Sequence, residues 1–190
     1  MSQVTILCFG HSFIRRLGEY CSREGANNLS LDSDRFRVSF EGIGGATILP
    51  GRKSLQNFVH VIRRCSPDII FLQIGENDLS SGVRPEELAK HVLSFGEFLA
   101  VVYRAHVIIG QLLPRTGLVF NGKVRVVNHI LAEKVKFVDN VVVWRHRGFY
   151  NPDIHFLLPD NVHLNEVGQR KLCRSLKYAV LNHANSHTGN

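Results

Sequence analysis

Short apolar runs alternate with longer amphipathic segments along almost the whole chain, and this alternation constrains the fold more than any other feature. The apolar runs are rich in β-branched residues, and each is followed by Gly, Pro, Asn or a charged residue. Such runs are typical of buried strands. We predict strands at residues 4–9, 36–40, 68–74, 106–113 and 140–144.

The longer segments show the spacing of helices that bury one face. Pro85 suits a first helical turn, and Glu86 and Glu87 would lie near the positive end of the helix dipole. Strands that are apolar throughout and alternate with helices favour a mainly parallel sheet covered on both faces, a three-layer α/β/α sandwich. We predict helices at residues 13–23, 52–64, 85–103, 122–138 and 166–183.

Length and composition fit one folded domain. The chain has 190 residues, of which 44% are hydrophobic and 21% are charged. These values exclude a disordered, collagen-like or coiled-coil chain, and the length suits a single core. We expect one domain over residues 1–183 and a polar tail over 184–190.

No targeting or metal-binding pattern stands out. The N-terminus lacks a basic region, its apolar run is too short for the core of a signal peptide, and no apolar run could span a membrane. We therefore expect an intracellular protein, cytoplasmic or nuclear. Cys8, Cys21, Cys65 and Cys173 show no CxxC pair and no zinc spacing with His, so we expect no metal, no cofactor and no disulfide framework.

Polar residues and glycines follow three of the predicted strands, where parallel sheets build their working sites. Ser12 follows the first strand and would lie at the N-terminus of a helix, as a nucleophile or as an ordinary cap. A glycine-rich turn at 42–47 follows the second strand, as a ligand-binding loop or a flexible connection. An amide and two carboxylates at 75–78 follow the third, as a site or an Asx turn.

Asp160 and His163 lie three residues apart shortly before the last predicted helix. In a turn, this spacing can place a carboxylate against an imidazole, which is the pair that a general base needs. Each of these signals is weak alone. Together they supply a nucleophile, oxyanion donors and a base in one chain, which favours an enzyme.

The same four blocks resemble the SGNH (GDSL-type) hydrolase superfamily, in the same order. Residues 10–12 are similar to its serine block, 43–47 to its glycine block, 75–78 to its GxND block and 160–164 to its DxxH block. The resemblance implies a flavodoxin-like SGNH fold. It also implies a serine esterase that hydrolyses a carboxylic ester, with a short acyl group such as acetyl, through an acyl-enzyme and without a cofactor.

The resemblance assigns roles to individual residues. Ser12 is expected to be the nucleophile, His163 the base and Asp160 the residue that orients it. The oxyanion hole would consist of the backbone N–H groups of Ser12 and Gly45 and the Asn77 side chain. The substrate would further contact Gly44, Glu76 and Arg115. Gly44 can also take the place of Gly45 in the alignment with the family. Arg115 ends a stretch, residues 111–115, that is similar to the family as well.

Two positions depart from the family pattern. His11 stands where the family usually has Asp, and Glu76 replaces a small residue of the third block. We expect Glu76 to make the acyl pocket narrower or more acidic, and we do not expect His11 to be the base. Residues 10–17 also resemble esterase-like domains of transposable-element proteins.

Two other functions stay open. The first is a non-catalytic domain of the same fold that binds an acylated or carbohydrate ligand. The second is an accessory nucleic-acid-binding domain, suggested by the net charge of +7. Its contact surface would be one basic stripe on the last helix, formed by Arg170, Lys171, Arg174 and Lys177. The acyl and alcohol groups of the substrate and the oligomeric state are not set by these patterns.

Overall fold

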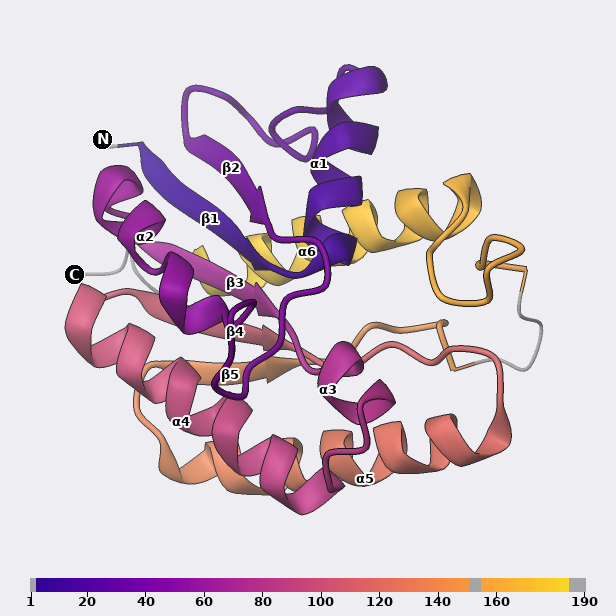
Figure 1. Cartoon of the computed structure of the whole chain (residues 1–190). Helices are drawn as coiled ribbons and strands as arrows, with labels where there is room; N and C mark the ends of the chain where they lie inside the picture. Colours follow the sequence, from indigo (N-terminus) through magenta and orange to yellow (C-terminus); the bar gives the residue numbers. More distant parts are fainter. Residues whose placement is uncertain (1–2, 151–154, 185–190) are drawn as a thin grey trace.

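The computed structural model of the chain, which describes residues 3–150 and 155–184, contains a five-stranded parallel sheet between two layers of helices (Figure 1). The strand order is β2-β1-β3-β4-β5, the flavodoxin-like order, and it confirms the predicted fold class. The strands are β1 (Val4–Gly10), β2 (Phe36–Gly42), β3 (Ile69–Gln73), β4 (His106–Gly110) and β5 (Val141–Trp144).

The helices divide between the two faces of the sheet. One face is covered by α1 (Ser12–Arg23) and α6 (Glu166–Ala184), and the other by α2 (His60–Cys65), α4 (Pro85–Tyr103) and α5 (Leu118–Lys134) (Figure 1). Successive side chains of the central strands alternate between the layers. In β3, Phe71 belongs to the core under α1 and α6, and Leu72 belongs to the core under α4 and α5.

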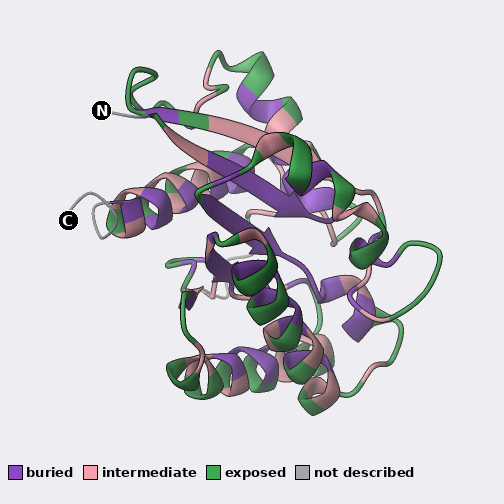
Figure 2. Cartoon of the chain, turned by 90° about the vertical axis from the view of Figure 1, so that its left-hand side faces the viewer, coloured by how far each residue is buried: buried purple, intermediate pink, exposed green. Residues whose placement is uncertain are grey.

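The central strands are buried as predicted, but the edge strands are not. Every residue of β3 is buried, whereas in β2 only Phe36 is buried and in β5 only Val141 (Figure 2). The prediction of fully buried strands is wrong at these edges. An edge strand has a neighbour on one side only, so part of its surface stays accessible.

The helices differ from their prediction in four places. The segment at 52–64 splits into a 3-10 turn (Leu55–Phe58) and the short α2, and α5 begins at Leu118 and passes into a second 3-10 turn (Val135–Phe137). A five-residue helix, α3 (Glu76–Ser80), follows β3 where an Asx turn was the alternative. The last helix extends to a buried Ala184, so the tail predicted at 184–190 is wrong at its first residue, and residues 185–190 lie outside the described residues.

None of the helices in the described ranges is both long enough and apolar enough to cross a membrane.

Candidate active site

The turn from β1 into α1 places Ser12 at a helix N-terminus. Gly10 ends the strand against β3, where an added Cβ would lie 2.1 Å from the Gln73 carbonyl oxygen, so only glycine fits. The N-cap of α1 is His11, whose Nδ1 accepts the N–H of Phe13 at 3.2 Å. Ser12 is therefore the first helical residue rather than the cap. Ser12 is 7% exposed and lies at the positive end of the helix dipole.

Asp160 and His163 form a hydrogen-bonded pair in the turn that precedes α6. His163 Nδ1 lies 2.7 Å from Asp160 Oδ2, and Asp160 Oδ1 accepts the backbone N–H groups of Val162 and His163 at 2.9 Å each. These bonds, first of all the one from the His163 backbone, hold the pKa of Asp160 well below its usual range. The Asp160 carboxylate thus holds the ring proton of His163 at Nδ1, which leaves a lone pair at Nε2. The His163 side chain is 23% exposed.

The Asp160–His163 turn lies over the start of α1. The ring of His163 meets the ring of Phe13 edge-on, with 6.5 Å between centroids, and Phe13 is the neighbour of Ser12. Among the described residues, no hydrogen bond joins the Ser12 hydroxyl to His163. Such contacts often tighten only when the substrate binds.

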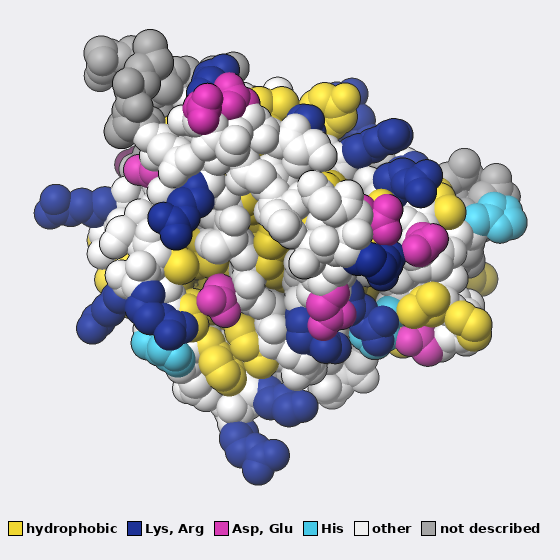
Figure 3. Space-filling view, turned by 90° about the horizontal axis from the view of Figure 1, so that it is seen from above, with side chains coloured by type: hydrophobic (Ala, Val, Ile, Leu, Met, Phe, Trp, Pro, Cys, Tyr) yellow, Lys and Arg dark blue, Asp and Glu magenta, His cyan; other side chains and the backbone are white. Residues whose placement is uncertain are grey.

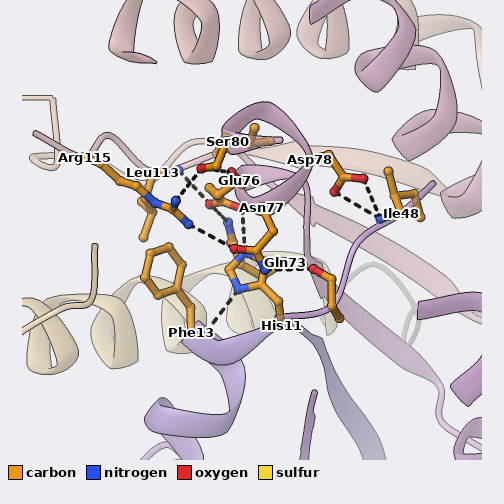
Figure 4. A network of polar contacts seen from close by, with 12 residues as sticks. His11, Phe13, Ile48, Gln73, Glu76, Asn77, Asp78, Ser80, Leu113 and Arg115 are labelled. Atoms are coloured by element: carbon orange, nitrogen blue, oxygen red, sulfur yellow. Dashed lines mark hydrogen bonds and ion pairs between the residues drawn. The ribbon is translucent and has the colours of Figure 1, made fainter. Parts of the chain in front are cut away.

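The glycine loop after β2 is held against α3. Asn77 Nδ2 donates to the carbonyl oxygen of Ala46 at 2.8 Å, and the Asp78 carboxylate accepts the N–H groups of Ile48 and Leu49 at 3.1 Å (Figure 4). Gly45 has φ of 73°, a left-handed conformation that favours glycine. These bonds bring the second and third blocks together, with Asn77 between the glycine loop and the carboxyl end of β3.

Arg115 connects the loop after β4 with the same group of residues. The side chain reaches Ser80 Oγ at 2.7 Å and Asn77 Oδ1 at 3.3 Å, so it orients the Asn77 amide (Figure 4). Next to it, Thr116 Oγ1 donates to Asn161 Oδ1 at 3.0 Å, which joins this loop to the Asp160–His163 turn. All four blocks therefore meet at the carboxyl edge of the sheet.

A cavity of about 510 Å³ opens beside this edge. Arg115 lies in its wall and is only 8% exposed, and Leu164, the neighbour of His163, lies in another part of the wall. The remaining lining is mostly apolar and includes Phe149, Phe156 and Leu157. A cavity of this size and character is typical of small-molecule sites.

The expectation for Glu76 is wrong in this structure. Its side chain has no exposed surface, and its carboxylate accepts three bonds: from His11 Nε2 at 2.6 Å, Gln73 Nε2 at 2.9 Å and the Leu113 N–H at 3.0 Å. The Glu76 side chain points into the core, where these three hydrogen-bond donors solvate its carboxylate. Glu76 therefore does not line an acyl pocket. Gly44 is half-buried in the loop, and no contact here assigns it a ligand.

Sequence reasoning missed the polar network behind Glu76. Gln73 Oε1 lies 3.0 Å from His146 Nε2, and His146 Nδ1 lies 2.8 Å from Ser175 Oγ. Burial lowers the pKa of the fully buried His146 to about 4, so the imidazole is neutral. The sequence signal that could have revealed this network is the position of its members at strand ends, because Gln73 ends β3 and His146 follows β5 by two residues.

The buried carboxylate of Glu76 predicts a pH-dependent contribution to stability. Burial alone would raise its pKa, but His11, the Leu113 N–H and Arg115 outweigh burial and lower it from 4.5 to about 2. A lowered folded-state pKa stabilises the protein above pH 4.5, and this contribution is lost as the pH falls toward 2. We expect Glu76→Gln to lower the free energy of unfolding by about 3 kcal/mol at pH 7.

Urea unfolding between pH 7 and pH 3 measures this effect. The difference between wild type and Glu76→Gln should shrink across the acid range. Glu133→Gln is the matched control, because that exposed carboxylate pairs with Lys136 at the surface. Equal unfolding free energies of wild type and Glu76→Gln at pH 7 would contradict the assignment.

The sequence model of the GDSL-like lipase/acylhydrolase family matches residues 6–176. The chain belongs to this family, and by class it is a carboxylic ester hydrolase. No curated protein sequence matches the chain.

Solved structures share the fold. An acetyl xylan esterase aligns with TM-score 0.68 and 18% identity, over 93% of this chain and 100% of its own. A family 3 carbohydrate esterase of Clostridium thermocellum aligns with TM-score 0.69 and 16% identity, over 99% and 100%. A member of the lipolytic G-D-S-L family from Veillonella parvula aligns with TM-score 0.69 and 21% identity, over 92% and 97%.

Proposed function

We propose that the chain is a serine esterase that works through an acyl-enzyme on Ser12. The observation that carries the proposal is the Asp160–His163 pair, with Nδ1 and Oδ2 2.7 Å apart, lying over the helix N-terminus that bears Ser12. A paired imidazole with a free Nε2 beside a serine at a positive helix end is the arrangement of an activated nucleophile.

In the first half-reaction, the Ser12 oxygen attacks the ester carbonyl while His163 Nε2 takes the hydroxyl proton. Asp160 keeps the other proton of the imidazolium at Nδ1 and stabilises its charge. The negative oxygen of the tetrahedral intermediate receives hydrogen bonds from the N–H groups of Ser12 and Gly45 and from the Asn77 amide. The bond to the alcohol oxygen then breaks, and His163 returns its proton to that alcohol.

In the second half-reaction, water replaces the alcohol. His163 Nε2 takes a proton from the water as its oxygen attacks the acyl carbonyl, and the same donors hold the oxyanion. The bond to the Ser12 oxygen breaks and His163 reprotonates it, which releases the carboxylic acid. One side of the Asn77 amide is bound to Ala46 O, so its second N–H is the one that serves the oxyanion.

For the substrate we propose a short acyl group such as acetyl on a larger alcohol. The similarity to two solved structures, an acetyl xylan esterase and a family 3 carbohydrate esterase, supports an ester of this kind. The cavity of about 510 Å³ is much larger than an acetyl group, so it suits the alcohol part. Arg115 in its wall offers a hydrogen-bond donor to that part.

A panel of acetyl to octanoyl esters, with sugar and lipid alcohols, tests the proposal. We expect kcat/KM to be highest for the acetyl and other short esters and to fall as the acyl chain lengthens. A folded wild-type protein that hydrolyses none of the esters would contradict the proposed function. A preference for octanoyl would contradict the short acyl group alone.

The predicted basic stripe on α6 is divided in the structure. Arg170 lies against Tyr20 of α1, and Lys177 Nζ donates to the Ser30 carbonyl oxygen at 2.6 Å. Lys171 turns the other way, with Nζ 4.6 Å from the centre of the Phe156 ring. In the view from above, Lys and Arg side chains lie scattered among hydrophobic and acidic ones rather than in one row (Figure 3).

A second candidate function rests on the other half of that stripe. Lys171 and Arg174 join Arg145 and Arg147 around a cavity of about 430 Å³, whose lining also includes Trp144 but no acidic residue. Four cations beside an aromatic ring favour accessory contact with the phosphates and bases of a nucleic-acid strand.

Fluorescence anisotropy with a single-stranded oligonucleotide tests this second candidate. We expect binding that weakens steeply with salt, and Arg145→Ala with Arg174→Ala should lower the affinity about tenfold or more and reduce the salt slope. Arg170→Ala is the control, because that side chain lies on the α1 side of the helix. Equal affinities of the double variant and the wild type would exclude this contact surface.

A further inference from the structure

The two positions that depart from the family pattern contact each other. His11 Nε2 lies 2.6 Å from Glu76 Oε2, and both side chains are completely buried (Figure 4). His11 comes from the turn before α1, and Glu76 begins α3, 65 residues further along the chain. The two replacements therefore form one buried pair directly behind Ser12.

The hydrogen bonds fix the protonation of His11. Its Nδ1 accepts the N–H of Phe13 at 3.2 Å, so Nδ1 carries a lone pair and the single ring proton is at Nε2. That proton is donated to Glu76. A proton at Nδ1 instead would place two N–H groups face to face and would break the cap of α1.

Glu76 is built to hold that tautomer. The carboxylate also accepts the side-chain N–H of Gln73 and the backbone N–H of Leu113, so its charge is met by three protein donors. A buried carboxylate that receives these bonds stays ionised and can only accept from Nε2.

We propose that His11 and Glu76 are a positioning pair that holds the turn bearing Ser12 in place. The imidazole Nδ1 caps the helix that carries Ser12, and the Glu76 carboxylate supplies the negative charge and holds the ring proton at Nε2. This inference rests on the proposed function for its effect on catalysis. His11 is not a second base, because its Nδ1 is occupied and its ring has no exposed surface.

The pair predicts that one replacement damages the site and that the second repairs it. His11→Asp places two carboxylates against each other, which cannot both be ionised in a buried site. We expect kcat of this variant to fall about 100-fold with little change in KM, because the Ser12 turn shifts. Adding Glu76→Ser removes the repulsion and leaves a single carboxylate, at position 11. The kcat of the double variant should therefore be about tenfold higher than the kcat of His11→Asp.

Hydrolysis rates of the wild type, both single variants and the double variant make up this cycle, at a temperature where all four are folded. Glu133→Gln, an exposed carboxylate on α5, is the control and should keep the wild-type kcat. A double variant no faster than His11→Asp, or a His11→Asp variant as fast as the wild type, overturns the pair's role.

Nitrogen NMR of the wild type gives a readout that does not depend on activity. The expected spectrum has His11 protonated at Nε2 and bare at Nδ1, and Glu76→Ser should shift this pattern. A proton at Nδ1 in the wild type overturns the proposal. If the NMR pattern is as expected but the wild type hydrolyses no ester, the proposed function fails, and the pair keeps its cap but loses its role in positioning a nucleophile.

Discussion

Ser12→Ala should lower kcat for ester hydrolysis by about 10⁴- to 10⁶-fold, because no other oxygen takes the place of the nucleophile at the end of β1. His163→Ala should fall into the same range, since the nucleophile and its base act as one unit. The double variant should be no slower than either single variant. Initial rates with the best ester of the panel measure all three.

The Ser12→Ala result is informative because the fold should survive it. The α1 cap is His11 and not Ser12, so loss of the hydroxyl removes no capping bond. Ser22→Ala, an exposed serine near the other end of the same helix, is the matched control and should keep the wild-type rate. A Ser12→Ala variant within tenfold of the wild type would show that the hydrolysis uses another group.

Asp160→Asn should lower kcat by about 10³- to 10⁴-fold while leaving the turn in place. Asp160 Oδ1 accepts the backbone N–H groups of Val162 and His163, and an asparagine oxygen can take over both bonds. Its NH₂ group would then face His163 Nδ1, which must accept rather than donate. The proton moves to Nε2, and the base is lost.

Asp160→Ala separates the two tasks of this side chain. It removes the bonds that shape the turn as well as the charge, so it should lower both thermal stability and kcat, whereas Asp160→Asn should lower kcat alone. Asp139→Asn, an exposed aspartate between α5 and β5, is the control and should change neither. A fully active Asp160→Asn variant would exclude the Asp160–His163 pair as the base.

The sequence predicted the sheet because the apolar runs have both the composition and the length of buried strands. The runs around β1, β3 and β4 are apolar throughout and end in Gly or polar residues, which is what a strand buried on both faces requires. The α4 boundaries follow from Pro85 at the start and match the prediction. The burial of the edge strands β2 and β5 was overestimated, because an apolar run does not reveal how many neighbouring strands a strand has.

The short helices were harder to predict. α3 has only five residues, fewer than the periodicity of a helix needs to be visible, and its start at Glu76 follows from bonds to residues far away in the sequence. The same reason explains the Glu76 error. Its sequence neighbours suggested a position in the site, whereas its partners His11 and Leu113 come from other strand ends and draw it into the core.

The positions of three of the four blocks at the carboxyl edge of the sheet were predictable, and the contacts among the blocks were not. Topology alone places Ser12, the glycine loop and Asn77 after neighbouring parallel strands. The bonds from Arg115 to Asn77 and from Thr116 to Asn161 depend on the path of the loop after β4, which no periodicity encodes.

Labelling with a fluorophosphonate, followed by mass spectrometry of the modified peptide, tests the central claim most directly. A fluorophosphonate reacts with a serine only when a neighbouring base activates it. We predict a single stoichiometric label on Ser12 of the wild type, and no label on His163→Ala. A folded wild-type protein that stays unlabelled would contradict the account and favour a binding domain of the same fold. A label on a different serine would also contradict the account, because it would assign the nucleophile to that serine.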